Sequence, residues 1–358
     1  MHLHIVGGFL GSGKTTAIIG AARYLMTLGK RVGVVTNDQG RYLVDTAFFR
    51  LGEVPAVEVT GGCFCCNYDD LDARLDHLRT AVDPDVIFAE SVGSCADIVA
   101  TVINPLSQLR GTAEPTSFSV FTDIRLLKRR LLGQALPFSD DVVYIFDKQI
   151  EEAGLLVINK SDLLLPVEAE DVLELARQSF RSKRVRLQSS LLAESTSEWV
   201  DLLESGSVPA AVSPLDIDYE RYGTGESRLA WLDEKVTMRV PEGSAQQVVT
   251  RALAAVAARL DSEGIPIGHV KALVEWDGGS VKVSFPALPV EDWHAGIPPI
   301  PGRSVSLLVN ARAETEAGKL KRVVQEAIGE VIRAAGGTYD ETGVAAFHPA
   351  APRPTHRM

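Results

Sequence analysis

Cysteine is scarce in this chain of 358 residues: there are four, and three of them stand in the run Cys63-Phe64-Cys65-Cys66. So few cysteines argue against a fold that depends on disulfides. Cys65 and Cys66 do not readily bridge each other, because disulfide geometry disfavours adjacent residues. In a reducing compartment such a cluster is more often metal-binding or redox-active than structural.

Positive charge is also in deficit, with 36 Lys and Arg residues against 47 Asp and Glu residues, a net charge of −11. This balance argues against nucleic-acid binding through a basic surface. No apolar run reaches the length of a membrane span. The first residues enter an apolar stretch at once, which leaves no room for a signal peptide. We therefore expect a cytoplasmic protein with neither nucleic acid nor membrane among its partners.

The first half of the chain alternates short apolar segments, rich in Val and Ile, with helical ones. Several apolar segments are hydrophobic nearly throughout, as strands buried on both faces are. The pattern predicts a doubly wound α/β domain with a largely parallel sheet over residues 1–205, whose ligand lies at the carboxyl ends of the strands. The expected strands are Leu3–Val6, Val32–Thr36, Ala56–Val59, Val86–Ala89, Phe118–Thr122 and Gly154–Asn159, and the expected helices are Thr15–Leu28, Leu71–Val82 and Asp97–Ile103.

The composition changes around residues 206–228, where glycine, proline and serine are typical of a linker. Residues 229–340 then predict a smaller α+β domain with the order β-α-β-β-β-α and with helices on one face of its sheet. Within it, Asp277-Gly278-Gly279 between two strand candidates predicts a hairpin. Residues 341–358 carry several prolines and are expected to form a flexible tail.

Residues 8–15 read Gly-Phe-Leu-Gly-Ser-Gly-Lys-Thr and fit the phosphate-binding loop (P-loop) pattern of nucleotide hydrolases. Glycines let the backbone fold around an anion, and the helix that follows adds its positive end. We therefore expect a nucleoside triphosphate here, with Lys14 on the β- and γ-phosphates and Thr15 on Mg²⁺. The nucleotide-binding residues expected in this loop are Gly8, Gly11, Ser12, Gly13, Lys14, Thr15 and Thr16.

A second magnesium position is expected at Glu90, which ends an apolar segment. Its carboxylate either holds Mg²⁺ through water or orients the attacking water. Capping of the next helix is the alternative. Gly93 would offer its N–H to the γ-phosphate, which makes residues 91–94 a switch segment. We expect Lys14, Glu90 and Asp38 to be the catalytic residues.

Asn159-Lys160-Ser161-Asp162 follows another apolar segment and fits the guanine-reading motif of GTPases. The carboxylate of Asp162 can accept two hydrogen bonds from guanine, a match that adenine does not offer. Lys160 would lie over the base, and Asn159 would tie loops together. Ser189 and Ser190 are positional candidates for backbone contacts with the guanine oxygen. A polar turn after a strand is the alternative.

Thiolates are soft ligands that select Zn²⁺ and related metals, so Cys63, Cys65 and Cys66 are candidate metal ligands. Three thiols give at most three ligands, and Asp38 is the candidate for a fourth. The sequence leaves open whether Glu90 or Asp38 lies nearer Mg²⁺, and which lies nearer the thiol-bound metal. The alternative is a group of small, partly buried residues without metal.

These motifs, in this order, resemble those of the CobW/HypB/UreG class of P-loop GTPases, and most of all its CobW-like branch of metal chaperones. The resemblance covers about residues 3–200, and the Cys-x-Cys-Cys run makes it specific. Two residues depart from the branch: Val92 stands where it usually has a small hydroxyl residue, and Asp38 replaces a more usual Glu. The C-terminal part lacks the histidine-rich stretches that many members carry.

The resemblance implies slow GTP hydrolysis coupled to delivery of a transition metal, usually Zn²⁺ or Co²⁺, to a client metalloprotein. Contacts of Mg²⁺ and the γ-phosphate would order the switch segment and preform the metal site, and hydrolysis would release it. A homodimer is expected by resemblance only. The alternative is a nucleotide-gated protein or cofactor chaperone in which the cysteine cluster is structural or redox-active.

Overall fold

The computed structural model describes residues 1–38, 40, 44, 49, 54–110, 115–210, 213–290 and 292–358, without the side chains of Asp38, Thr60, Arg110 and Pro115. The chain divides into two compact units. The first comprises Met1–Gln39, Asp45–Gly225 and Ala351–Met358, and the second comprises Gly40–Val44 and Glu226–Ala350.

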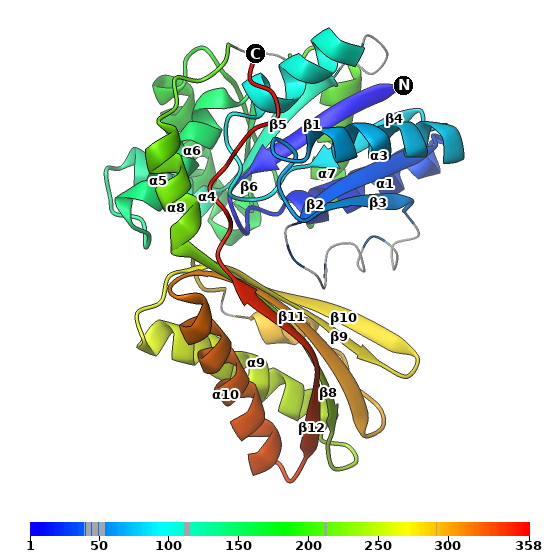
Figure 1. Ribbon diagram of the computed structural model, residues 1–358, viewed down its shortest axis with the longest axis vertical. Helices are drawn as coiled ribbons and strands as arrows, with labels where there is room; N and C mark the ends of the chain where they lie inside the picture. Colours follow the sequence, from blue (N-terminus) through cyan, green and yellow to red (C-terminus); the bar gives the residue numbers. More distant parts are fainter. Residues whose placement is uncertain are drawn as a thin grey trace. The chain divides into compact units, whose positions relative to one another are not determined.

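Within the described residues, the first unit is built on seven parallel strands in the order β3-β2-β4-β1-β5-β6-β7 (Figure 1). Strand β1 is central and pairs with β4 and β5. Every residue of β4 and β6 is buried, which explains their uniformly apolar sequences and confirms the doubly wound α/β fold. The strands are His2–Gly8 (β1), Val32–Asp38 (β2), Ala56–Thr60 (β3), Val86–Glu90 (β4), Pro115–Asp123 (β5), Leu155–Asn159 (β6) and Arg184–Leu187 (β7).

Helices pack on this sheet, and α1 and α7 share one of its cores, where Ala17, Ile18 and Trp199 are fully buried. Helices α5 and α7 and strand β7 were not among the elements expected from the sequence. The stretch expected as a helix at Asp97–Ile103 is π-helical over Val99–Ile103. The helical elements described are α1 (Lys14–Thr27), α3 (Tyr68–Ala81), η1 (Val99–Ile103), η2 (Leu106–Arg110), α4 (Ile124–Leu131), α5 (Asp140–Glu152), η3 (Ser161–Leu163), α6 (Pro166–Ser179), α7 (Ala193–Glu204) and α8 (Tyr219–Arg228).

The second unit has an antiparallel sheet in the order β10-β9-β11-β8-β12, with α9 and α10 together on one face (Figure 1). Apolar residues of both helices and of the sheet form its core. The predicted hairpin is confirmed at β9 and β10. The elements are β8 (Leu229–Arg239), α9 (Ala245–Ser262), β9 (Ile267–Trp276), β10 (Gly279–Pro286), η4 (Trp293–Gly296), β11 (Ser304–Glu314), α10 (Ala317–Ala334) and β12 (Thr338–Phe347).

Two segments differ from the expected domain plan. Helix α8 occupies the second half of the stretch expected as a linker at 206–228. Residues 341–347, expected to begin a flexible tail, belong to strand β12, which pairs with β8. The residues after it, Ala351–Met358, belong to the first unit and hydrogen-bond to it. Residues 341–347 and 351–358 are therefore held by partners that are distant in sequence, and local composition does not predict such contacts.

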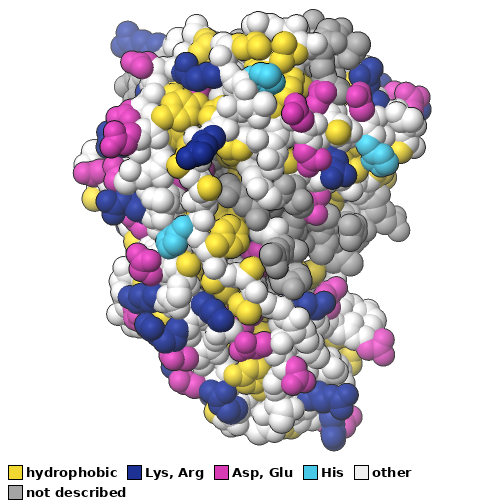
Figure 2. Space-filling view, in the orientation of Figure 1, with side chains coloured by type: hydrophobic (Ala, Val, Ile, Leu, Met, Phe, Trp, Pro, Cys, Tyr) yellow, Lys and Arg dark blue, Asp and Glu magenta, His cyan; other side chains and the backbone are white. Residues whose placement is uncertain are grey.

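On the face drawn in Figure 2, the charge of the described residues does not mark a binding site. On the side drawn in Figure 2, Lys and Arg side chains are interspersed with Asp and Glu. In the part of the chain that the structure describes, no helix combines the length and hydropathy needed to cross a bilayer. The carboxyl ends of the parallel strands are the better guide to a site, because loops that follow them gather at one edge of the sheet.

At the opposite edge, a polar cluster ties the start of β1 to the end of α7. Glu204 Oε1 lies 2.9 Å from His2 Nδ1 and 3.0 Å from His4 Nε2. His4 is buried, and its Nδ1 lies 2.7 Å from Ser117 Oγ. Burial lowers the pKa of His4. The hydrogen bond with His4 lowers the pKa of Glu204 to about 2. Neutral His4 donating to ionised Glu204 satisfies both groups.

Glu204→Gln is expected to destabilise the protein at neutral pH, by an amount that shrinks as the pH falls below about 5. Folding lowers the pKa of Glu204 from 4.5 to about 2. The contribution of Glu204 to stability is therefore complete above the pKa of the unfolded state and is lost as the pH falls toward the pKa of the folded state. Urea unfolding at several pH values measures this difference. Glu194→Gln, at an exposed position of the same helix, is the control. A constant difference between Glu204→Gln and the parent would contradict the assignment.

Candidate functional site

The loop between β1 and α1 has the backbone of an anion-binding turn. Gly8, Gly11 and Gly13 adopt φ values of 126°, 70° and 94°, which side chains of L residues rarely allow. A Cβ atom on Gly8 would also clash with the backbone of Phe121, and one on Gly13 would clash with the Asn159 amide. Helix α1 begins at Lys14, so its free N–H groups and positive end face this loop. The P-loop predicted from sequence is therefore formed.

Two side chains of the P-loop point to a charged ligand. The Lys14 ammonium is buried and donates to the carbonyls of Gly8, at 2.7 Å, and Phe9, at 3.3 Å. The Ser12 hydroxyl is buried and has no hydrogen-bond partner among the described residues. An anion in the loop would give both groups a strong acceptor.

The structure brings Thr15 and Glu90 together. Thr15 Oγ1, in the first turn of α1, donates to Glu90 Oε1, at the end of β4, over 2.9 Å. Both side chains are buried. A hydroxyl beside a carboxylate is a donor set that hard divalent cations prefer. Glu90 thus faces the P-loop rather than capping the helical segment that follows it.

The segment after Glu90 is clamped between the P-loop and α5. A Cβ atom on Gly93 would lie 2.7 Å from the Leu10 side chain and 3.1 Å from its backbone. On the other side, Gln149 Nε2 donates to the carbonyls of Gly93, at 3.1 Å, and Cys95, at 2.8 Å. A movement of this segment would therefore disturb its contacts with both the P-loop and α5.

The guanine motif connects three loops. Asn159 is buried, and its Nδ2 donates to the Ser12 carbonyl over 2.7 Å. Its Oδ1 accepts from the amide and hydroxyl of Ser190, at 3.0 and 2.9 Å. The amides of Ser190 and Ser189, expected at a guanine oxygen, thus bond Asn159 and Ser195 instead.

The rest of the motif differs in exposure. Lys160 adopts φ 63°, and its Nζ lies 3.1 Å from Asp123 Oδ2. Burial lowers the pKa of Lys160, against the opposing effect of Asp123. Asp162 is exposed. A carboxylate in that position can receive hydrogen bonds from an incoming base.

The three clustered thiols converge. Cys63 Sγ lies 2.8 Å from Cys65 Sγ and 3.2 Å from Cys66 Sγ, and the last two sulfurs are 3.7 Å apart. Cys63 and Cys65 are buried and Cys66 is half-buried. The end of β2 holds this loop in place: Asn37 Nδ2 donates to the Gly62 carbonyl over 2.8 Å, and its Oδ1 accepts from the Phe64 amide over 2.8 Å.

The thiols differ in acidity. The contact with Cys65, followed by those with the other neighbouring thiols, holds the pKa of Cys63 well below its usual range. The contact with Cys63 raises the pKa of Cys65 well above its usual range and raises that of Cys66 to about 11. The cluster therefore holds one readily formed thiolate, Cys63, among thiols that keep their protons.

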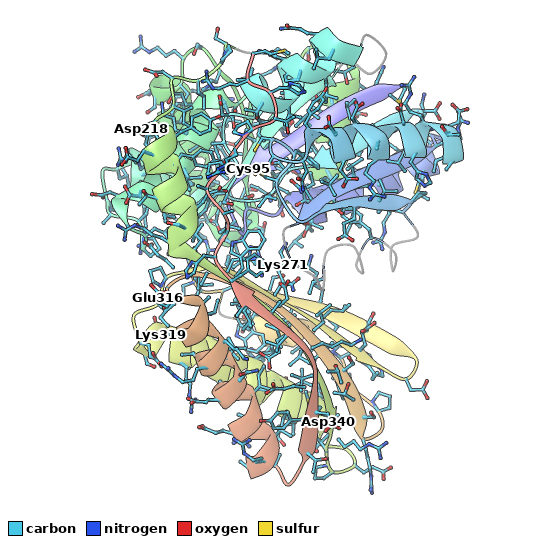
Figure 3. All side chains as sticks on the ribbon, in the orientation of Figure 1. Cys95, Asp218, Lys271, Glu316, Lys319 and Asp340 are labelled. Atoms are coloured by element: carbon cyan, nitrogen blue, oxygen red, sulfur yellow. The ribbon has the colours of Figure 1, made fainter. Side chains whose placement is uncertain are left out.

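Sequence reasoning set Cys95 apart from this cluster, but the structure does not. Cys95 is buried in the first unit (Figure 3) and hydrogen-bonds through its side chain to Cys63 and Cys65. The only sequence signal was that it is the fourth thiol of a chain poor in cysteine. The Asp38 side chain, expected beside the cluster, lies outside the described residues.

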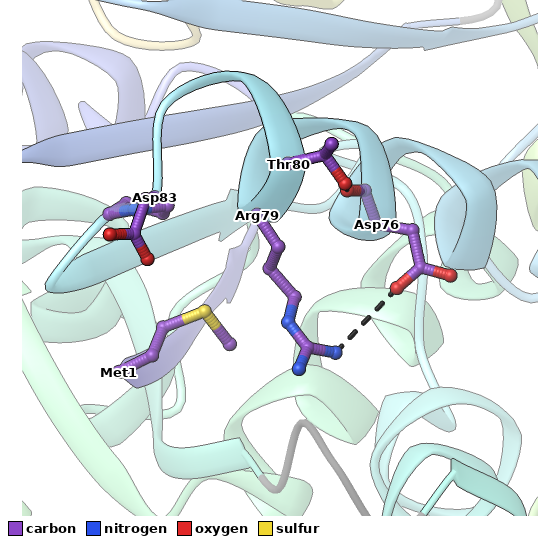
Figure 4. Close-up of a pocket in the computed structure, with 6 residues that line it drawn as sticks. Met1, Asp76, Arg79, Thr80 and Asp83 are labelled. Atoms are coloured by element: carbon purple, nitrogen blue, oxygen red, sulfur yellow. Dashed lines mark hydrogen bonds and ion pairs between the residues drawn. The ribbon is translucent and has the colours of Figure 1, made fainter.

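A hollow of about 460 Å³ lies elsewhere in the first unit (Figure 4). Met1 and Pro84 line it just before β1 and β4, so it lies at the amino ends of the strands, away from the P-loop. Its other lining residues include Asp76 and Arg79, which form an ion pair of 3.6 Å. It therefore has no part in the nucleotide site.

The model of the CobW/HypB/UreG nucleotide-binding domain matches residues 2–188, more than half of the chain. The chain belongs to the CobW/HypB/UreG family. Two relatives place it with the CobW-like branch. The zinc chaperone YeiR of Escherichia coli is 29% identical over 178 residues, which are 48% of this chain and 49% of YeiR. The zinc chaperone CobW of a Sinorhizobium species is 26% identical over 189 residues, which are 45% of this chain and 51% of that protein.

The chain thus spans about half the length of each of these relatives. Among solved structures of this family, HypB of Helicobacter pylori in complex with nickel is similar to 60% of this chain and 91% of its own, at 18% identity and a TM-score of 0.44. The family match covers the P-loop, Glu90, the thiol loop and the guanine motif, so it assigns nucleotide binding to the first unit.

Gly93→Ala is expected to lower the free energy of unfolding by about 1–3 kcal/mol, because a new Cβ must displace Leu10. It should also weaken nucleotide binding, since Leu10 belongs to the P-loop. Urea unfolding and the fluorescence of a labelled nucleotide measure the two effects. Gly318→Ala, where a Cβ meets nothing within 4 Å, is the matched control. Equal behaviour of the two variants would show that Gly93 is not packed as described.

Proposed function

We propose that this protein is a GTP-hydrolysing metallochaperone that binds a transition metal, with Zn²⁺ and Co²⁺ as candidates, and delivers it to a client metalloprotein. The main support is a buried thiol cluster beside a segment that also packs on the P-loop. Two relatives that carry the name of zinc chaperone support the choice of metal.

The nucleotide would be GTP, bound at the carboxyl edge of the sheet. Glycines in the left-handed region and the buried Ser12 hydroxyl suit its phosphates, together with the amides at the start of α1 up to Thr16. Exposed Asp162 would accept the hydrogen bonds that distinguish guanine, and the Lys160 stem would lie beside the base. Asn159 would couple this base-binding loop to the P-loop through Ser12.

Thr15 and Glu90 would hold Mg²⁺, since their paired oxygens fit a hard cation. When bound, Mg²⁺ neutralises charge that develops on the transferred phosphate. Lys14 would exchange the carbonyls of Gly8 and Phe9 for phosphate oxygens, which accept more strongly from an ammonium. The Gly93 amide would contact the γ-phosphate, and Asp38 remains the candidate second carboxylate.

Cys63, Cys65 and Cys66 would bind the metal. The compact sulfur cluster suits a soft or borderline ion, and the low pKa of Cys63 supplies a first thiolate. Coupling to the nucleotide would pass through the segment from Glu90 to Cys95, which contacts Thr15 and Leu10 at one end and the thiols at the other. GTP would then favour one arrangement of the thiol site and GDP another.

A second candidate is a nucleotide-gated protein whose thiols act in redox chemistry. The 2.8 Å approach of Cys63 Sγ to Cys65 Sγ favours it, because a thiolate beside a thiol is poised for oxidation. In that case replacing the thiols would change sensitivity to oxidants and leave metal handling unaffected.

Cobalt titration of the reduced protein tests the proposal. We expect a cobalt–thiolate absorption band. The affinity for cobalt read from this band should change at least fivefold when Mg²⁺ and a non-hydrolysable GTP analogue are added, which is the lower end of typical coupling between two sites. The triple variant Cys63→Ser, Cys65→Ser, Cys66→Ser should lose the band and keep nucleotide binding. An ATP analogue is the control and should leave the affinity unchanged.

Strong thiolate binding that ignores the nucleotide would indicate a structural metal. A missing band under all conditions would overturn the metallochaperone proposal and favour the redox candidate, which a count of oxidisable thiols would then check.

A further inference from the structure

The thiol site lacks a described fourth ligand. Zinc in proteins is almost always four-coordinate and tetrahedral in closed thiolate sites. The Cys-x-Cys-Cys run supplies three sulfurs. The tetrahedron is completed either by a group outside the run or by an exchangeable ligand.

Cys95 lies next to the sulfurs of the run and is the candidate for this ligand. Its side chain is buried and contacts two of the three sulfurs, those of Cys63 and Cys65. A Zn–S length of about 2.3 Å gives a tetrahedron whose sulfurs are about 3.8 Å apart. The Cys65–Cys66 separation of 3.7 Å already equals this edge, and the shorter separations need only modest expansion. The three sulfurs of the run can therefore surround one ion with little backbone movement, and Cys95 lies beside two of them.

The backbone around Cys95 is fixed from several sides. The Cys95 amide donates to the Val92 carbonyl over 3.1 Å, and its carbonyl accepts from Gln149 Nε2 over 2.8 Å. The next amide, of Ala96, donates to Tyr222 Oη over 3.0 Å. These contacts fix the backbone at Cys95 before any metal binds, as a preorganised ligand requires.

We propose that Cys95 is the fourth ligand of the transferred metal, so that the ion joins the thiol loop to the segment that follows Glu90. This assignment rests on the proposed metallochaperone function and makes its coupling more specific. One ligand in four would sit on the segment that packs against the P-loop, so a shift of Glu90 or Gly93 changes the coordination directly. By linkage, the bound metal biases that segment in return.

X-ray absorption of the zinc-loaded, reduced protein, together with the cobalt spectrum, tests the assignment. We expect four sulfur ligands in the parent. Cys95→Ala should have three sulfurs and one light atom, lose about a quarter of the cobalt–thiolate intensity, and bind zinc at least about tenfold more weakly. Cys66→Ala, which removes a ligand of the run, is the matched variant and should give the same sulfur count. Unfolding curves and nucleotide binding check that each variant is folded.

Three sulfurs in the parent and an unchanged spectrum in Cys95→Ala would overturn the role of Cys95 and leave the metallochaperone proposal standing. No thiolate coordination in the parent would overturn both. If Cys95→Ala does not fold, the sulfur count of the parent alone decides.

A second observation, independent of Cys95, concerns the segment 353–358. The Arg353 amide donates to Cys66 Sγ over 3.2 Å. Thr355 donates to the Cys65 carbonyl through its amide, at 2.9 Å, and to the Cys66 carbonyl through its hydroxyl, at 3.2 Å. The segment therefore lies across the half-buried side of the thiol loop.

Its far end is anchored on the helical stretch that follows Cys95. Arg357 Nε donates to Asp97 Oδ2 over 2.8 Å, and Tyr219 Oη donates to the same oxygen over 2.6 Å. Asp97 is fully buried, so the Arg357 charge compensates a desolvated carboxylate. The Met358 amide adds a bond of 2.8 Å to the Ala100 carbonyl.

We infer that residues 353–358 form a strap over the thiol site, whose Arg353 amide positions Cys66 and whose release exposes that sulfur. This inference rests on the proposed function only for the claim that Cys66 binds a metal. That the segment covers Cys66 does not depend on the proposed function.

Alkylation of Cys66 by N-ethylmaleimide, followed by peptide mass spectrometry, tests the strap on the metal-free protein. Arg353→Pro removes the amide donor and Arg353→Ala keeps it. We expect Cys66 to react about tenfold faster in Arg357→Ala, which loses a charged bond to the buried Asp97, than in the parent or Arg353→Ala. Arg353→Pro should speed the reaction by a smaller factor, because the lost amide bond also helps to lower the pKa of Cys66. Equal rates in all four proteins would overturn the strap.

Discussion

The parallel course of the strands around β1 is the constraint on which the site depends. Because the strands described in the first unit all run the same way, the residues that follow β1, β4 and β6 meet at one edge. The P-loop, Glu90 and Asn159 are brought together by this rule and then linked by two hydrogen bonds, Thr15 to Glu90 and Asn159 to Ser12. Reversing any of these strands would carry its chemistry to the opposite edge, where the His2, His4 and Glu204 cluster lies.

Much of this arrangement was readable from the sequence, because the motifs stand at the ends of apolar strands. The P-loop, Glu90 and Asn159 were each placed at a strand end, and the parallel sheet brings strand ends together. The second unit was also largely predictable, since its hairpin has an Asp277-Gly278 turn and its helices are amphipathic.

The remainder depends on contacts between residues far apart in the chain. Cys95 joins the thiols through a contact between the segment after β4 and the loop after β3, and nothing near Cys95 in sequence signals this contact. Gln149 clamps residues 93 and 95 from a helix that the hydrophobic pattern did not reveal. The segment 351–358 has the composition of a disordered end, and its order comes from a buried carboxylate, Asp97, that requires a cation. Such tertiary partners outweigh local propensity.

Under the proposed function, the unequal acidity of the thiols has a consequence for the direction in which a metal would move. Only Cys63 ionises readily, while Cys65 and Cys66 hold their protons beyond neutral pH. Loading the cluster therefore expels hydrogen ions into the buffer, and unloading takes them back up. A recipient whose ligands are already ionised releases fewer hydrogen ions on binding the same metal. Acidification would then favour the recipient over this protein. The local pH would thus act on the exchange even if contact between the two proteins changed the metal affinity of neither.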